Sequence, residues 1–214
     1  PETTDADVLE AAVLRRADWT PLGTRAQAIR CQAAVGEAAV VFTPSWYAYA
    51  DQANPDTPVQ GCERGASDSM LEALPRGVGR TALCAIGWRA VVRPGAAYPY
   101  AGMGVRTAGS MGDVEAIWIE TRSSGKSFEI RAQLNLEDQE FFECGDPRKA
   151  PYEQRLRCDG TGEWVRWRLP VAGFKPAYGK PDALDPGRVV SLHFQNAPGH
   201  EGPLECDVRI GGVE

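Results

Sequence analysis

Three segments near the C-terminus alternate apolar and polar residues, and this alternation constrains the fold more than any other feature of the chain. In the segment 189–195, Leu192 and Phe194 alternate with His193 and Gln195. A period of two is typical of a half-buried strand, because successive side chains of a strand point to opposite faces. The pattern therefore predicts an antiparallel sheet with one core face and one polar face.

The same alternation recurs upstream. Residues 114–122 form the strongest strand pattern, residues 123–126 read as a turn, and residues 128–135 are expected to return as the second strand of a hairpin. About eight to ten such strands are separated by turn signals. The sequence therefore predicts an all-β protein, a β-sandwich of the jelly-roll type.

The N-terminal part of the chain has a different character. Residues 5–16 are rich in Ala and Leu, with Asp5 as a candidate N-cap and basic residues at the end, which favours a short helix. A frayed arm is the alternative. We expect residues 1–25 to be an N-terminal extension or linker, and residues 26–214 to form a single jelly-roll domain.

The charge of the chain excludes one class of partner. The net charge is −6 and the pI is about 5.1, whereas binding to a phosphate backbone requires a basic face. No run of about 18 apolar residues is present, so we expect no transmembrane segment. The chain begins at Pro1, for which we expect either a removed signal segment or a trimmed N-terminus. We expect a monomer without a nucleic-acid partner.

Six cysteines and two histidines are present. The cysteines form no Cys-x-x-Cys motif, so a zinc site is not expected. An even number of cysteines spread along the chain favours disulfides and a secreted, periplasmic or cell-surface location; six free thiols in a cytosolic protein are the alternative. Of about 15 pairings, we favour Cys62–Cys84 and Cys144–Cys158, which close short loops, and Cys31–Cys206, which ties the N-terminal arm to the last strand.

The polar face of the predicted sheet carries side chains that suit a glycan. A sugar presents hydroxyls and a patch of C–H groups, so its site combines forked polar groups with planar rings that are held rigidly. A solvated outer face is the alternative. The polar candidates are Glu129, Arg131, Gln133, His193 and Gln195, with Ser191, Glu120 and Arg122 expected beside them.

An aromatic segment precedes the first long loop. Trp46, Tyr47 and Tyr49 are spaced as in a strand, and they form either a stacking platform for a sugar or part of the core. Tyr100, in a second Tyr-containing segment, is a further candidate for stacking.

No catalytic motif is complete. No Gly-x-Ser-x-Gly occurs, and nothing marks Ser191 as a nucleophile although it shares a strand face with His193. Glycoside hydrolysis needs two carboxylates that flank the bond, and Glu120 and Glu129 are the candidates near one predicted hairpin. We therefore expect no enzyme, with a polysaccharide hydrolase or lyase as the alternative.

The order of the C-terminal segments resembles a known group of modules. Trp164 and an amphipathic strand lead to a Pro-x-x-x-Phe turn, then to Leu-Asp-Pro-Gly-Arg-Val-Val-Ser-Leu-His-Phe-Gln at 184–195, and then to a short strand with Asp207. This order resembles the end of a galactose-binding-like β-jelly roll, as in family 11 carbohydrate-binding modules and the complex I intermediate-associated protein family. The resemblance covers residues 40–210 and rests on strand types.

The resemblance implies a non-catalytic glycan-binding module of a secreted or cell-surface bacterial protein, with the glycan on the concave sheet and contacted by Tyr, Arg, Asp and His. An adhesion or assembly module that binds a protein with the same face is the alternative. The resemblance also implies a structural Ca²⁺ near the first and last strands, for which Asp51, Asp56 and Asp207 are the candidates.

Overall fold

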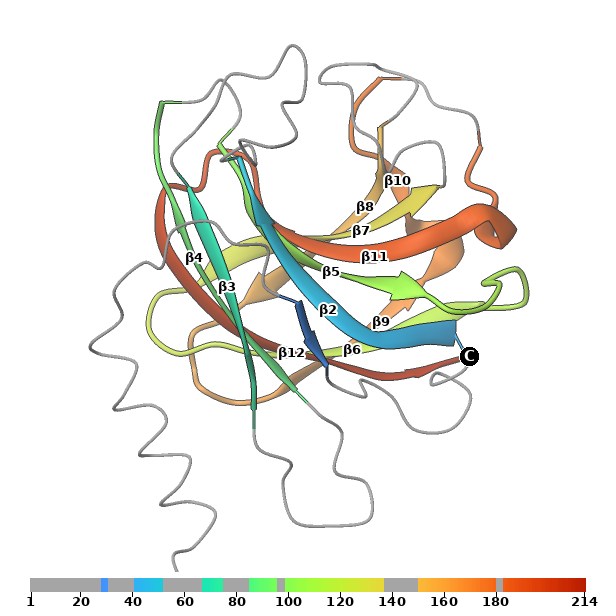
Figure 1. Cartoon of the computed structure of the whole chain (residues 1–214), viewed down its shortest axis with the longest axis horizontal. Helices are drawn as coiled ribbons and strands as arrows, with labels where there is room; N and C mark the ends of the chain where they lie inside the picture. Colours follow the sequence, from blue (N-terminus) through green and yellow to red (C-terminus); the bar gives the residue numbers. More distant parts are fainter. Residues whose placement is uncertain are drawn as a thin grey trace, which may run out of the picture.

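The chain folds into an antiparallel β-sandwich, which confirms the predicted fold class (Figure 1). The computed structural model describes residues 28–30, 41–51, 67–74, 85–95, 99–136, 150–179 and 183–214. Two sheets pack face to face, and the chain passes repeatedly from one sheet to the other, as in a jelly roll. The buried side chains of both sheets therefore share one core.

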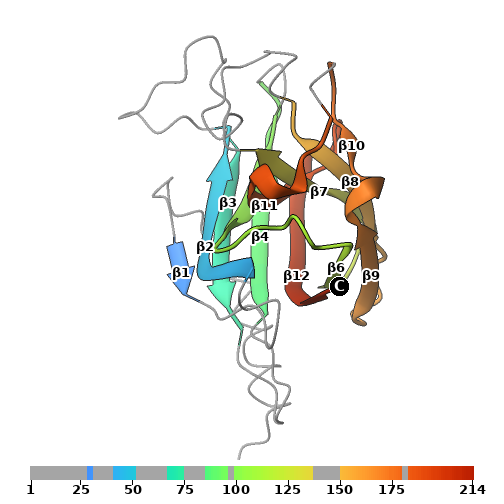
Figure 2. The ribbon, with the colours of Figure 1, turned by 90° about the vertical axis from the view of Figure 1, so that its right-hand side faces the viewer.

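The first sheet has seven strands in the order β1-β2-β5-β11-β7-β8-β10. Figure 2 shows β1 at one edge of the molecule and β8 and β10 toward the other. The strands are β1 (Ala28–Arg30), β2 (Phe42–Ala50), β5 (Ala101–Thr107), β7 (Phe128–Leu136), β8 (Tyr152–Cys158), β10 (Lys175–Pro176) and β11 (Val189–Asn196).

The second sheet has five strands in the order β3-β4-β12-β6-β9. Its strands are β3 (Asp68–Ala73), β4 (Ile86–Val92), β6 (Ala116–Arg122), β9 (Val165–Pro170) and β12 (Gly202–Val213). Two short 3₁₀ turns, η4 (Val171–Gly173) and η5 (Pro186–Arg188), lie in the connections. In the ranges that the structure describes, no helix is long and apolar enough to cross a membrane.

The alternation seen in the sequence fills the space between the sheets. Leu192 and Phe194 of β11 are fully buried, and Trp46 of β2 stacks on Phe194 with a centroid distance of 6.4 Å. Ile119 of β6 and Ile210 of β12 are fully buried on the opposing sheet. Each such side chain contributes about 1.5–3 kcal/mol relative to an exposed one, so this face is the main source of stability.

A polar link also joins the two sheets. The indole nitrogen of Trp88 donates to the hydroxyl of Ser69 at 3.0 Å, and this hydroxyl donates to the carbonyl of Gly102 at 2.7 Å. Trp88 and Ser69 belong to the five-stranded sheet and Gly102 to the seven-stranded sheet. The link satisfies groups that would be costly to bury without a partner.

The predicted hairpin of residues 114–135 is wrong. β6 pairs with β12 and β9 in the five-stranded sheet, whereas β7 pairs with β11 and β8 in the seven-stranded sheet. The connection between them carries Gly125 at a φ of 95° and forms a bridge from Ser124 to Thr161. Alternation identifies the buried face of a strand but not its sheet, because both sheets bury one face in the same core.

Two cysteines correct the predicted disulfide pairs. In the structure, Cys158 of β8 and Cys206 of β12 are bonded to no other cysteine, and their sulfurs lie 3.5 Å apart in the core. Neither residue therefore has the partner expected for it. The sandwich instead brings β8 and β12, which belong to opposite sheets, together at these two side chains. Cys31, Cys62, Cys84 and Cys144 lie outside the described residues, so the pair Cys62–Cys84 stays a prediction.

The N-terminal predictions also lie outside the described residues. They are the extension or linker of residues 1–25 and the helix expected in residues 5–16. The boundary between this segment and the domain therefore stays a prediction.

Candidate functional site

Two rows of side chains cross the outer face of the seven-stranded sheet. Residues that lie opposite each other on neighbouring strands point to the same face. The first row is Tyr47, Gly104, His193, Gln133 and Glu153, and the second is Tyr49, Gly102, Gln195, Arg131 and Arg155. The pairing of β7 with β11 thus brings together the four polar residues that the sequence predicted to converge.

Glycines on β5 make room for the aromatic rings. A Cβ atom at Gly102 would lie 2.4 Å from Cζ of Tyr49, and a Cβ at Gly104 would lie 2.6 Å from Cδ2 of His193 and 2.9 Å from Cζ of Tyr47. Any side chain at these positions would displace the rings. The rings of Tyr47 and Tyr49 therefore cross the bare backbone of β5 and reach His193 of β11.

The structure resolves the two alternatives for the aromatic segment residue by residue. Trp46 is fully buried in the core, whereas Tyr47 and Tyr49 lie on the outer face and are partly exposed. The centroid of Tyr49 is 5.1 Å from that of His193 and 6.2 Å from that of Tyr100. The tyrosines and the histidine form one aromatic cluster, which we call the Tyr–His cluster: Tyr47, Tyr49, Tyr100 and His193.

The Tyr–His cluster is held neutral by its surroundings. Burial lowers the pKa of His193 to about 3, and the charge of Arg106 acts in the same direction. Burial raises the pKa of Tyr49 well above its ordinary value, with a further increase from Tyr47. Burial and the neighbouring Asp51 also raise the pKa of Tyr100. At pH 7 the cluster therefore offers neutral rings, hydroxyls and one imidazole.

One buried polar atom of the cluster lacks a hydrogen-bond partner among the described residues. The hydroxyl oxygen of Tyr49 is buried and has no partner within the described part of the chain. The hydroxyl of Tyr47, in contrast, lies 2.5 Å from Nε2 of His193. A buried polar group without a partner costs about 1–3 kcal/mol, so the Tyr49 hydroxyl is suited to an external donor or acceptor.

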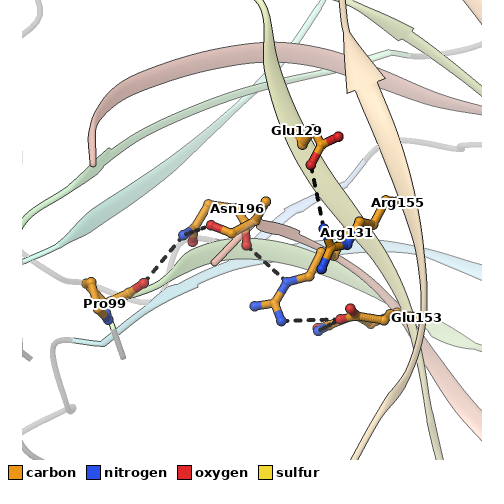
Figure 3. A network of polar contacts seen from close by, with 8 residues as sticks. Pro99, Glu129, Arg131, Glu153, Arg155 and Asn196 are labelled. Atoms are coloured by element: carbon orange, nitrogen blue, oxygen red, sulfur yellow. Dashed lines mark hydrogen bonds and ion pairs between the residues drawn. The ribbon is translucent and has the colours of Figure 1, made fainter. Parts of the chain in front are cut away.

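A polar network borders the cluster (Figure 3). Arg131 donates from Nε to the carbonyl of Asn196 at 3.1 Å and from a terminal nitrogen to Glu153 at 3.2 Å. Gln133 reaches the same Glu153 oxygen at 3.4 Å. The Asn196 amide in turn donates to the carbonyl of Pro99 at 3.4 Å. This network fixes the guanidinium of Arg131 next to the aromatic rings.

The alternative of a solvated outer face does not describe the part of this face around Arg131. The side chains of Arg131 and Glu153 are only 15% and 13% exposed, and Gln133 is buried. Glu129 is exposed as expected and pairs loosely with Arg155, with 3.9 Å between their charged atoms. The sequence pattern distinguishes inward from outward side chains. How exposed an outward side chain is depends on the side chains that neighbouring strands place next to it.

Two residues expected at this site lie on the other sheet. Arg122 and Glu120 of β6 face outward from the five-stranded sheet, where Arg122 pairs with Asp207 and Glu120 with Arg209. The guanidiniums of Arg122 and Arg209 lie 4.8 and 4.3 Å from the ring centroid of Trp164. The hydrolytic pair of Glu120 and Glu129 is therefore split between the two sheets.

The aspartates proposed for calcium have protein partners. Asp207 is 4% exposed and accepts two hydrogen bonds from Arg122, at 2.9 and 2.6 Å. Asp51 accepts from the backbone and the hydroxyl of Ser67, at 2.9 and 3.0 Å. Carboxylates engaged by donors do not fit a calcium site, which requires six to eight oxygen ligands. No group of three or more possible metal ligands occurs in the described ranges, and Asp56 lies outside them.

A hollow lies beside η4 and β10, away from the Tyr–His cluster. Its lining is mainly apolar and includes Tyr152, Val171, Phe174, Pro176 and Leu184. Within the described ranges, its charged lining residues are Glu115 and Lys175. It lacks the dense hydrogen-bonding groups of the outer face and is the weaker candidate for a polar ligand.

Sequence reasoning missed Glu153, Gly102 and Gly104. Glu153 lies on β8, whose Glu-Gln-Arg run at 153–155 did not stand out as a strand of the polar face. Gly102 and Gly104 alternate within one segment, and that spacing was the available signal, because two glycines on one strand face leave it bare. Their effect depends on strands β2 and β11, which are remote in sequence.

Comparisons with known proteins add a likeness of fold. No family model matches the chain, and no curated protein matches it. Among solved structures, it is similar to the family 11 carbohydrate-binding module from Clostridium thermocellum in complex with a β-1,3-1,4-mixed-linked tetrasaccharide. The identity is 17%, the TM-score is 0.48, and the match covers 79% of this chain and 90% of that chain.

A second similar structure is the family 11 module of a cellulosomal cellulase of Clostridium thermocellum. It is 14% identical with a TM-score of 0.47, and the match covers 90% of this chain and 98% of that chain. The resemblance to the complex I intermediate-associated family stays a prediction. One fold hosts many functions, so the function of this chain has to be argued from the outer face itself.

Proposed function

We propose that this chain is a non-catalytic carbohydrate-binding module that holds a glycan against the outer face of the seven-stranded sheet. The observation that carries the proposal is the Tyr–His cluster next to Arg131. Planar rings contact the C–H patches of a sugar, while a rigid guanidinium fork and an imidazole bind its hydroxyls. Tyr47, Tyr49, His193 and Arg131 stand on paired strands and Tyr100 directly precedes β5, which keeps these groups in place before a ligand binds.

The Tyr49 hydroxyl supports a ligand rich in hydroxyl groups. It is buried and has no partner in the described part of the chain. A sugar hydroxyl both donates and accepts hydrogen bonds, so it can pair with the Tyr49 hydroxyl either as donor or as acceptor. Binding would then remove a penalty that the free protein carries.

The outer face of the five-stranded sheet is less suited to sugar stacking. Its two outward tryptophans are Trp118 and Trp164, and guanidinium groups already lie over both rings: Arg166 over Trp118 at 4.3 Å, and Arg122 and Arg209 over Trp164. Cation–π contacts of this kind stabilise the sheet. The rings of the Tyr–His cluster, in contrast, lie against one another, with centroids 5.1–6.3 Å apart.

The carboxylates of the proposed face support a binding role rather than hydrolysis. Glu153 is paired with Arg131 and Glu129 with Arg155, so the described part of this face offers no two unpaired carboxylates to flank a glycosidic bond. We also propose a secreted, periplasmic or cell-surface location, where a polysaccharide ligand is accessible.

The test is a panel of glucans, xylans and mannans probed with three proteins: the wild type, Tyr49→Ala, and the control Arg166→Ala on the opposite sheet. We expect the wild type and Arg166→Ala to be retained equally on at least one glycan. Tyr49→Ala should bind at least about tenfold more weakly, equivalent to about 1.4 kcal/mol. Circular dichroism checks that each variant is folded.

Two results would contradict the proposal. If the folded wild type binds no glycan of the panel, the adhesion or assembly alternative takes its place. If reducing ends are released from a bound glycan, the protein is an enzyme.

A further inference from the structure

The sulfurs of Cys158 and Cys206 meet in the core, although the two residues belong to different sheets. Cys158 ends β8 of the seven-stranded sheet, and Cys206 lies in β12 of the five-stranded sheet. Their Sγ atoms are 3.5 Å apart, and the residues are 2% and 0% exposed. We propose that Cys158 and Cys206 form a disulfide bond that joins the two sheets across the core.

The geometry requires little movement. The two sulfurs must approach by about 1.5 Å to reach the S–S bond length of about 2.05 Å. Both side chains already point inward, since Cys158 lies opposite Phe128 at the end of the β7–β8 pair and Cys206 lies opposite Trp88 in β4. A disulfide between the sheets of a β-sandwich is an established arrangement in antibody domains, which shows that two packed sheets tolerate such a bond.

The bond has to form during folding, before the sandwich closes. In the closed sandwich neither thiol is accessible to an oxidant. The hydrogen bond with Cys158 and then burial raise the pKa of Cys206, so the reactive thiolate is suppressed once the protein has folded. In the unfolded chain both thiols are exposed and have ordinary reactivity.

The oxidant is a small disulfide, such as oxidised glutathione, or the disulfide of an oxidoreductase. The thiolate of one cysteine attacks it, forms a mixed disulfide and releases one thiol. The second cysteine thiolate then attacks the cysteine sulfur of the mixed disulfide and releases the second thiol. Two protein thiols are oxidised by two electrons, and one disulfide is reduced to two thiols.

This pairing has a consequence for the other cysteines. It removes Cys144–Cys158 and Cys31–Cys206 from the possible native disulfides, whereas Cys62–Cys84 remains compatible with it. The bond would also enclose β9, β10 and β11 in one covalent loop. The strand β11, which carries His193, would therefore lie within this covalent loop.

Tryptic mapping distinguishes the alternatives. The full chain is reduced, refolded with a mixture of reduced and oxidised glutathione, alkylated in denaturant and digested with trypsin without reduction. We expect the peptide 158–166 to be linked to the peptide 189–209. The proposal is overturned if 158–166 is linked to 132–148, if 189–209 is linked to 31–64, or if both peptides are alkylated.

Single variants give an independent measurement. In Cys158→Ala, the newly alkylated thiol should be Cys206, and in Cys206→Ala it should be Cys158. A newly alkylated Cys144 in the first variant, or Cys31 in the second, would show the other pairings. If the bond is present, the unfolding midpoint of each variant should lie roughly 5–15 °C below that of the oxidised wild type.

Discussion

The hydroxyl of Tyr47 lies 2.5 Å from Nε2 of His193, although the two residues are 146 positions apart in the sequence. The contact joins β2 to β11 across Gly104 of β5. Because the pKa of His193 is lowered to about 3, its ring is neutral at pH 7, and Nε2 pairs with the hydroxyl in either tautomer. The contact orients both rings of the proposed glycan face.

The neutral His193 makes stability depend on pH. In the unfolded chain the ring gains a proton below its ordinary pKa of 6.5, whereas the folded ring stays neutral down to about pH 3. The unfolded state then binds more protons, so stability falls as the pH drops from 6.5 toward 3. Between pH 7 and 4.5, the stability advantage of the wild type over His193→Gln should shrink by about 2–3 kcal/mol, measured by urea unfolding.

Proton NMR checks the same prediction directly. The chain has two histidines, and the variant His200→Gln assigns their resonances. The His193 signal should not shift between pH 7 and 4.5. A His193 signal that titrates near pH 6 would show that the ring is solvated and that the cluster is open.

The two tyrosine hydroxyls should respond differently to removal. Tyr49→Phe removes a buried hydroxyl that has no partner in the described part of the chain, so the stability of the free protein should stay equal or rise by up to about 1 kcal/mol. Tyr47→Phe removes the contact with His193 and should cost about 0.5–1.5 kcal/mol.

Glycan titration completes this comparison. If the Tyr49 hydroxyl receives a sugar hydroxyl, Tyr49→Phe should weaken binding about 2–10-fold while the protein remains fully stable. Unchanged affinity would remove this hydroxyl from the binding face.

Gly102 should not tolerate a side chain. Its Cβ would lie 2.4 Å from the Tyr49 ring and 2.8 Å from the carbonyl of Phe194, so Gly102→Ala should cost about 1–3 kcal/mol and weaken glycan binding. Gly212→Ala is the matched control, because no heavy atom lies within 4 Å of its Cβ. Near-UV circular dichroism reports the position of the tyrosine rings. Equal unfolding midpoints and spectra for the two variants would show that Tyr49 does not cross β5.

Arg131→Ala should destabilise the protein, because it leaves Glu153 largely buried without its cation. We expect a loss of about 1–3 kcal/mol in urea unfolding. Arg155→Ala is the control, since that side chain is 60% exposed and its pair with Glu129 spans 3.9 Å, and it should cost less than about 0.5 kcal/mol. A similar small effect of both substitutions would mean that the network around Asn196 does not hold Arg131.

The sequence by itself determined the class of the fold and the faces of its strands. The alternation in 189–195 predicted that Leu192 and Phe194 are buried and that His193 and Gln195 lie opposite, and the structure confirms both. Alternation is sufficient for this because the side chains of a strand point to its two faces in turn.

Only the tertiary structure decided which strands are neighbours. β6 and β7 are adjacent in sequence yet lie in different sheets, while β2 and β11 are distant and flank the same strand β5. The partner of Arg131, the space over Gly102 and the meeting of Cys158 with Cys206 all follow from that arrangement. Strand pairing depends on contacts between residues that are far apart in the sequence. A local residue pattern therefore does not predict which strands are neighbours.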